Sequence, residues 1–184
     1  SGASSAAIMR HLCRSGCGSV STPVHLFATS AEARCRCLGT RWHVHETPLP
    51  RESFWRAGEG TLSPCPELCF VQLAETLPFP RLLEVGFELC GGYAKRPDAP
   101  GGFIKRPSVS TISLMKSFLS SCGPRRGNEQ AVRAARYLAE GSASPMETAA
   151  YLLLCLPERY GGHGLPRARM NCRIDIDERK RATT

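Results

Sequence analysis

The sequence of 184 residues has no long apolar run, and several common signatures of enzymes are missing from it. No stretch approaches the roughly 20 apolar residues of a membrane-spanning helix, so we expect no membrane partner. The first ten residues are small and mostly polar and lack the apolar core of a signal peptide, which favours a cytoplasmic protein. There is no nucleophile motif, Walker loop or dinucleotide fingerprint, which argues against the enzyme classes that these motifs mark.

The ten cysteines are scattered, and no two of them form a Cys-x-x-Cys pair. Three pairs of cysteines lie near each other in the sequence: Cys13 and Cys17, Cys35 and Cys37, and Cys65 and Cys69. Together with His43 and His45 they could supply zinc ligands, but their spacing differs from that of the usual zinc knuckles. Cys90 and Cys155 lie in apolar patterns, where a free thiol behaves as a small hydrophobic residue. We therefore expect reduced, mostly buried thiols. The cysteines are Cys13, Cys17, Cys35, Cys37, Cys65, Cys69, Cys90, Cys122, Cys155 and Cys172.

The net charge of +8 and the pI near 9.2 favour an anionic partner, most often nucleic acid. Two Lys-Arg pairs enclose an expected loop at 95–106, and such a loop either contacts phosphates or is solvated surface. Further basic residues lie at Arg136 and in the tail from Arg167 to Arg181. The candidate nucleic-acid-binding residues are Lys95, Arg96, Lys105, Arg106, Arg125, Arg126 and Arg133.

Alternating and apolar runs predict strands, and capped stretches with helical periodicity predict helices. The expected strands lie at 24–27, 41–46 and 61–62, with a loop at 49–55. The expected helices lie at 31–36, 64–74, 80–90, 110–119 and 128–139. These elements predict an α/β or α+β fold in which a small mixed sheet is flanked by helices.

The composition divides the chain into four expected segments. They are a linker or remnant of an upstream module (1–20), an α/β domain (21–93), a basic loop with a helical region (94–141) and a C-terminal segment (142–184).

The C-terminal segment begins with a well-marked helix start, because Ser144 can cap the first free N–H groups and Pro145 fits the first turn. Glu147 follows three residues after the cap and is either a capping carboxylate or a Mg²⁺ ligand; a lone carboxylate favours the capping role. An expected strand at 172–176 contains Asp175. Glu178 and Lys180 complete a D…ExK-like pattern, but Glu178 follows Asp175 by only three positions, too few for the two acids to lie within separate paired strands, so coincidence is favoured.

His43 and His45 lie on one face of their expected strand, as metal ligands or a proton-transfer pair would. The simpler interpretation is a polar strand face that meets water, and we prefer it.

Several short motifs occur in an order that is shared with a known family. They are Val24–Leu26, Trp42–His45, Leu49–Pro50, Ser63–Leu68, Leu89–Tyr93 and Ser144–Thr148. This order resembles the C-terminal region of AbiEi-type abortive-infection antitoxins. The Ser144–Thr148 helix resembles the opening of a very-short-patch-repair-like endonuclease of the PD-(D/E)xK class, which follows in related actinobacterial proteins.

The resemblance implies an antitoxin-like domain at 21–93 and a partial endonuclease-like segment at 142–184. It implies Glu147 and Asp175 as catalytic carboxylates around Mg²⁺, but the chain departs from the pattern by lacking the second acidic strand. No winged helix-turn-helix precedes residue 20 either.

We therefore expect a DNA-associated phage-defence or toxin–antitoxin-type protein without catalysis or cofactor in this form, with a toxin or defence component as a possible protein partner. One alternative is a metal-dependent DNA endonuclease that uses Glu147 and is completed by a partner or a longer chain. Another is a protein-interaction module or inhibitor without a nucleic-acid role.

Overall fold

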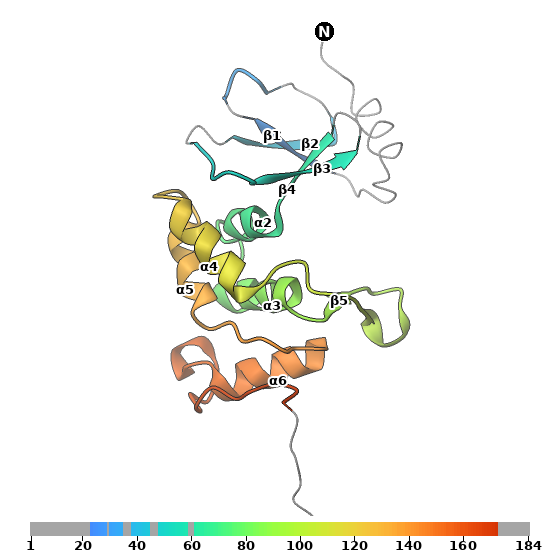
Figure 1. Cartoon of the computed structure of the whole chain (residues 1–184), viewed down its shortest axis with the longest axis vertical. Helices are drawn as coiled ribbons and strands as arrows, with labels where there is room; N and C mark the ends of the chain where they lie inside the picture. The colour runs from blue at the N-terminus through green and yellow to red at the C-terminus, as the bar shows by residue number, and fades with distance from the viewer. Residues whose placement is uncertain (1–22, 29, 35–37, 45–47, 59–60, 173–184) are drawn as a thin grey trace, which may run out of the picture.

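The computed structural model describes residues 23–28, 30–34, 38–44, 48–58 and 61–172. Within these ranges it contains five α-helices and three two-stranded sheets, so the fold is of the mixed α/β class. Strands β1 to β4 lie at one end of the molecule, helices α2 to α5 form its middle, and α6 lies at the other end (Figure 1). None of the described helices is both long enough and apolar enough to cross a membrane.

The N-terminal strands form two separate sheets. β1 (Val24–Ala28) pairs with β2 (Thr40–Val44) in parallel, and β3 (Phe54–Gly58) pairs with β4 (Thr61–Pro64) in antiparallel orientation. The expected strands are present, but they are divided between two sheets. Phe27 and Phe54 meet edge to face at 5.0 Å, so an aromatic contact links β1 to β3.

Two local expectations for the N-terminal half are wrong. The expected loop at 49–55 ends in β3, because the backbone from Phe54 onward pairs with β4. The expected helix at 31–36 is a turn over its described residues, where the Arg34 N–H donates to the Ala31 carbonyl at 3.3 Å. A segment this short makes too few hydrogen bonds to offset the entropy of helix nucleation.

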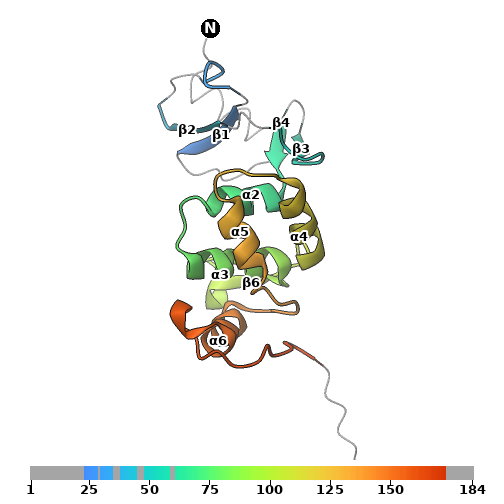
Figure 2. The same ribbon diagram turned by 90° about the vertical axis from the view of Figure 1, so that its left-hand side faces the viewer.

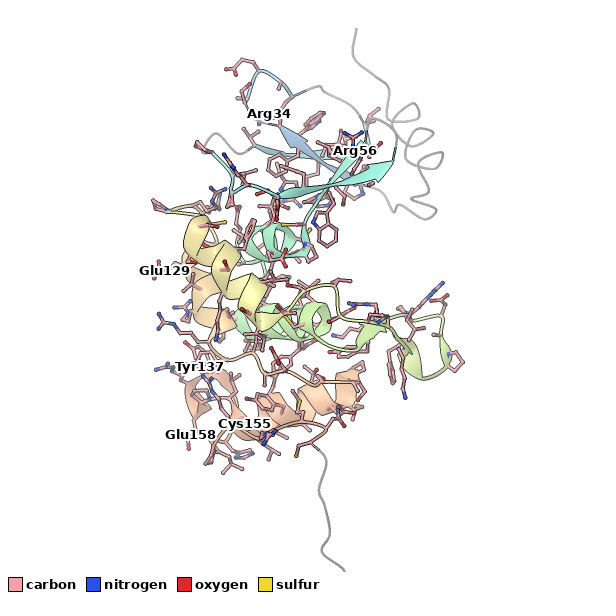
Figure 3. The ribbon with its side chains drawn as sticks, viewed as in Figure 1. Arg34, Arg56, Glu129, Tyr137, Cys155 and Glu158 are labelled. Carbon is pink, nitrogen blue, oxygen red and sulfur yellow. The ribbon has the colours of Figure 1, made fainter. Side chains whose placement is uncertain are left out.

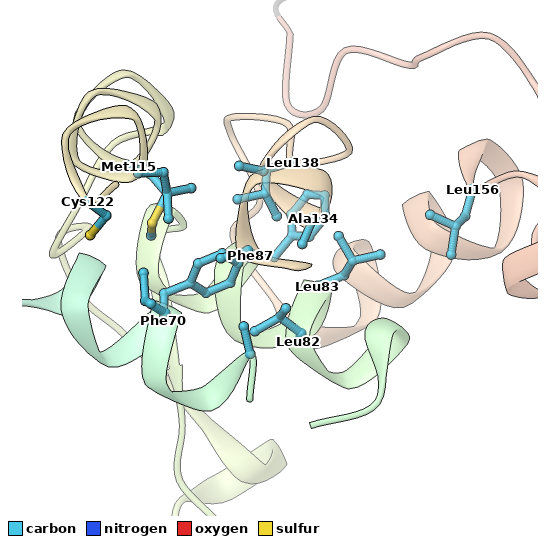
Figure 4. Close-up of a cluster of buried hydrophobic side chains, with 14 of the residues drawn as sticks. Phe70, Leu82, Leu83, Phe87, Met115, Cys122, Ala134, Leu138 and Leu156 are labelled. Atoms are coloured by element: carbon cyan, nitrogen blue, oxygen red, sulfur yellow. The ribbon is translucent and has the colours of Figure 1, made fainter. Parts of the chain in front are cut away.

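The helical middle consists of four helices, which are α2 (Pro66–Leu73), α3 (Phe79–Cys90), α4 (Ile112–Ser121) and α5 (Asn128–Ala135). Their apolar faces enclose the hydrophobic core, to which Phe70, Leu82, Leu83, Phe87 and Met115 contribute fully buried side chains (Figure 4). α5 ends before the expected residue 139, because a turn at Arg136 and Tyr137 directs Leu138 into the core.

The expected basic loop is a hairpin of β5 (Tyr93–Lys95) and β6 (Phe103–Lys105), with a 3₁₀ turn η1 (Pro100–Gly102) between the strands. It projects from the helical middle on one side (Figure 1). The buried Tyr93 hydroxyl bonds the Thr148 hydroxyl at 2.8 Å and so anchors the hairpin to α6 (Pro145–Cys155). η2 (Glu158–Tyr160) follows α6. Of the expected strand at 172–176 only Cys172 lies in the described part, where it is exposed.

Substitution of two glycines between α4 and α5 tests how tightly this turn is packed. Gly127 and Gly123 both have a positive φ, of 81° and 64°. A Cβ on Gly127 would collide with the Val71 carbonyl oxygen and lie 2.9 Å from Cγ of Glu75, whereas a Cβ on Gly123 would meet nothing within 4 Å. We expect Gly123→Ala to lower the free energy of unfolding by about 1–2 kcal/mol through backbone strain alone. Gly127→Ala should lower it by about 2–5 kcal/mol, because overpacking is added to the strain. Urea unfolding of both variants measures the difference, and equal losses would contradict the packing described for α5.

Candidate nucleic-acid interface

The basic residues of the β5–β6 hairpin are largely engaged within the protein. Lys95 Nζ lies 2.6 Å from Oε2 of Glu84, and Arg96 Nε lies 3.3 Å from Oδ1 of Asp98. The Arg106 guanidinium donates to the carbonyls of Glu88 and Pro107, both at 2.8 Å, so it fixes the base of the hairpin. Lys105 is exposed. The hairpin therefore presents less free positive charge than its sequence suggests.

Arg125 and Arg126 hold the α4–α5 turn in place. Arg125 donates to the Cys122 carbonyl at 2.9 Å and to the Pro48 carbonyl at 2.7 Å, so it ties the turn to the N-terminal half of the chain. Arg126 Nε lies 3.8 Å from Oε2 of Glu75. Both residues have structural contacts that a phosphate would have to compete with.

The predicted basic residues do not form one surface. The hairpin extends from one side of the helical middle, and α5 lies on the opposite side (Figure 1). In the view turned by 90°, α5 is in front and β6 lies behind the helices (Figure 2). Arg133, which lies on α5, is therefore separated from Lys95, Arg96, Lys105 and Arg106.

Arg133 belongs to a group of aromatic and basic side chains where α5 meets α3 and η2. The rings of Phe79, Tyr137 and Tyr160 contact one another, with centroids 4.3 to 5.8 Å apart. The Arg133 guanidinium lies 5.4 Å above the ring of Phe79. The Arg159 guanidinium lies 4.9 Å above the ring of Tyr160 and donates to the Tyr137 hydroxyl at 3.2 Å. Each of these two cations is thus held against an aromatic ring.

Three more cations extend this group. Arg167 donates to the carbonyl of Arg136, which places both side chains at the C-terminal end of α5. Arg136 and Lys116 line an apolar groove of about 230 Å³ between α4 and α5. We refer to the whole surface as the basic–aromatic face. It consists of Phe79, Lys116, Arg133, Arg136, Tyr137, Arg159, Tyr160 and Arg167.

The charge on the basic–aromatic face is not neutralised internally. All five cations are exposed, and no ion pair within the described ranges includes any of them. Glu129 and Glu158 are exposed acids near its margin, along the same edge as Tyr137 (Figure 3). Lys116, Arg159 and the aromatic residues were not predicted, because they are isolated along the chain. Arg133 and Arg136 are three positions apart, which puts both on one face of a helix, and this spacing is the sequence signal that indicates the face.

Glu147 makes the contacts of a helix cap. Ser144 Oγ accepts from the Glu147 N–H at 3.2 Å, and Glu147 Oε2 accepts from the Ala143 N–H at 2.9 Å and from Asn171 Nδ2 at 2.6 Å. The hydrogen bond from Ala143, with smaller contributions from Asn171, Ser144 and nearby Lys105, holds the pKa of this carboxyl below its ordinary value. Asp175 lies outside the described residues, and so do Glu178 and Lys180.

His43 pairs with a histidine of the neighbouring strand. Its Nε2 lies 2.8 Å from Nδ1 of His25, and the two rings stack at 5.0 Å. Partial burial, followed by the charges of His25 and Arg41, lowers the pKa of His43. His45 lies outside the described residues. In the part of the chain that the structure covers, no three His, Cys, Asp or Glu side chains come together as a metal centre would require.

The six described cysteines are free: Cys65, Cys69, Cys90, Cys122, Cys155 and Cys172. Burial raises the pKa of Cys65 to about 12 and that of Cys90 to about 11, so both are held as unreactive thiols. Cys13, Cys17, Cys35 and Cys37 lie outside the described residues. The expectation of buried thiols therefore holds for Cys65 and Cys122, whereas Cys172 is exposed.

No protein-family model matches the chain, and neither a curated protein nor a solved structure matches it. The assignment of a function therefore depends on the residues and on the geometry of the described part of the molecule.

Replacement of Glu147 by glutamine tests its role as a cap. We expect Glu147→Gln to lower the free energy of unfolding at pH 7 by about 0.3–1 kcal/mol, since the carboxylate interacts favourably with the N-terminus of α6. Because folding lowers the pKa of Glu147, this stabilisation is present above its ordinary pKa of 4.5 and is lost as the pH falls through the folded value. Urea unfolding of the variant and the wild type should therefore differ at pH 7 and converge at acidic pH. The exposed Glu140→Gln serves as the control, and a loss that persists at acidic pH would contradict the capping role.

Proposed function

We propose that this protein binds duplex DNA without sequence specificity through the basic–aromatic face, and that the 184-residue chain does not cleave it. The observation that carries the proposal is the group of five exposed cations on one face, none of which is ion-paired within the described residues. Lys and Arg side chains at phosphates release condensed counterions, and this release drives binding that does not depend on sequence.

The aromatic residues of the face support the proposal by holding two of the cations in place. Arg133 lies above Phe79, and Arg159 is bonded to Tyr137. A side chain that is already ordered in the free protein loses less conformational entropy when a phosphate binds it. Arg136 and Lys116 lie on either side of the α4–α5 groove and can contact a backbone that crosses it.

The sequence resemblance supports the wider context of this proposal. The motif order from Val24 to Thr148 resembles that of AbiEi-type antitoxins, which belong to phage-defence and toxin–antitoxin systems, and we propose DNA association with a toxin or defence component as protein partner on that resemblance. The molecular proposal does not require that context, because it depends on the charge and geometry of the basic–aromatic face.

The endonuclease alternative depends on Glu147. Its Oε2 already accepts two hydrogen bonds, from Ala143 and Asn171, and these would have to be released for that oxygen to bind a metal ion. Mg²⁺ is usually held by one or two carboxylates together with substrate phosphates. The contacts of Glu147 favour the capping role over metal binding.

A charge-matched pair of double variants tests the DNA-binding face. Lys116→Gln with Arg136→Gln removes two free cations, whereas Arg81→Gln with Lys95→Gln removes two cations that are paired with Glu84. In a titration of a labelled duplex at several salt concentrations, we expect the first variant to bind roughly tenfold more weakly at low salt and to reduce the log–log salt slope by about 2. The second variant should bind much as the wild type does.

Two outcomes would overturn the assignment to this face. Equal losses in both double variants would mean that net charge, rather than the basic–aromatic face, determines binding. No binding at low salt, or binding that does not change with salt, would favour the protein-interaction alternative.

A plasmid assay tests the absence of cleavage. We expect supercoiled plasmid to remain intact with the purified chain in the presence of Mg²⁺ or Mn²⁺, because Oε2 of Glu147 is engaged by Ala143 and Asn171 and is not free to hold a metal ion. Metal-dependent nicking that is abolished by Glu147→Gln, in a variant with an unchanged circular dichroism spectrum, would establish the endonuclease instead.

A further inference from the structure

A pocket of about 250 Å³ lies between the β3–β4 hairpin and helices α2 and α4, away from the basic–aromatic face. Its lining residues come from β3, the start of α2 and α4, and from the segments just before β3 and α4. The lining residues that matter for its chemistry are Trp55, Cys65, Glu67, Val109, Leu114 and Phe118.

Glu67 is a buried acid in this pocket. Its side chain is only 7% exposed. Oε1 accepts a hydrogen bond from the Ser110 hydroxyl. This partner is neutral, and no ion pair in the described ranges includes Glu67. Burial of a carboxylate without a cation is unfavourable, so a bound cation would relieve this cost.

The N-terminus of α2 compensates the carboxylate only in part. Glu67 lies in the first turn of α2, where the helix dipole favours a negative charge. That interaction explains why an acid is tolerated at this position. It does not account for the pocket beside the acid.

Part of the pocket wall is apolar and open to solvent. Trp55 is 49% exposed, Val109 40% and Leu114 57%, and the ring of Phe118 is half-buried. Aromatic faces attract organic cations, and aliphatic walls favour an apolar stem. A carboxylate at the base with aromatic and aliphatic walls around it is therefore complementary to a cation that is carried on an apolar chain.

The rim adds one charge of each sign. Arg51 and Glu52 are both exposed and line the mouth. Glu52 has a φ of 65°, a left-handed conformation that is uncommon for a residue other than glycine and is often found at binding sites. With Glu67 included, the lining is net negative, although the whole chain has a charge of +8.

We propose that this pocket binds an organic cation, a guanidinium or primary ammonium group on an apolar stem, with Glu67 as its counter-ion and Trp55 beside the stem. The same chemistry is offered by a free alkylamine or alkylguanidine and by an arginine or lysine side chain of a polypeptide. This inference is independent of the DNA-binding proposal, because it concerns a different surface and a ligand of opposite charge.

Tryptophan fluorescence can report binding directly. The chain has two tryptophans, so Trp42→Phe leaves Trp55 as the single reporter within the pocket. We expect N-acetyl-arginine amide and agmatine to change the Trp55 emission in a saturable way, and N-acetyl-citrulline amide, which is neutral and has nearly the same shape, to have no effect. In the same background, Glu67→Gln should weaken binding by at least tenfold, and the rim variant Glu52→Gln by less than threefold.

The source of the cation is distinguished by a longer probe. If Ac-Leu-Arg-Leu-amide binds tenfold more tightly than N-acetyl-arginine amide, the exposed Val109 and Leu114 contribute and a polypeptide is the source. Equal affinities identify a free small cation as the ligand.

A second variant keeps the test decisive if Glu67→Gln does not fold. Leu114 is exposed, so Leu114→Lys places an ammonium group at the mouth of the pocket, where it should prevent the cationic probe from binding. The neutral control Leu114→Gln should still bind the probe. Equal binding of the arginine and citrulline probes would overturn the proposal. A folded Glu67→Gln variant that binds the arginine probe with the same affinity as its parent would also overturn it. The proposal would fail as well if Leu114→Lys left the affinity for the probe unchanged.

Discussion

The close packing of Phe70 and Leu138 over Gly86 is the contact on which the helical middle depends. A Cβ at Gly86 would lie 2.8 Å from the side chain of Leu138 and 3.0 Å from that of Phe70, so glycine lets both side chains pack against α3 without being displaced. Leu138 enters the core just after α5 has ended. The same turn leaves Tyr137 facing outward against Phe79, and in this way the core packing creates the basic–aromatic face.

Most of the helices could be predicted closely from the sequence, whereas the helix expected at 31–36 and the strand pairing could not. α3 was expected at 80–90 and spans Phe79–Cys90. Ser144 caps the N-terminus of α6, as the sequence around it predicted. These features are encoded by neighbouring residues. The parallel pairing of β1 with β2 joins segments that are separated along the chain, so local sequence does not specify it. β3 was missed because its first residues were expected in a loop, and the single expected sheet is therefore two.

The candidate interface was predicted only in part for a related reason. A run of basic residues shows where cations are, but it does not show which acids or carbonyls neutralise them. Lys95 is paired with Glu84, and Arg125 donates to the carbonyl of Pro48, which is 77 residues away. Arg133 was recognised among clustered basic residues, whereas Arg159 is isolated along the chain and meets Tyr137 only in the folded protein. Free charge is a property of the folded surface.

Helix α4 separates two surfaces of opposite chemistry. Leu114, Ser117, Phe118 and Ser121 follow the spacing of one helical face and line the pocket of Glu67, whereas Lys116, Leu119 and Ser120 line the groove toward α5. The two surfaces share no lining residue and open to solvent on different faces of α4, so a ligand on one surface does not occupy the contacts of the other. One helix thus contributes both to the face that we propose for DNA and to the pocket that we propose for an organic cation.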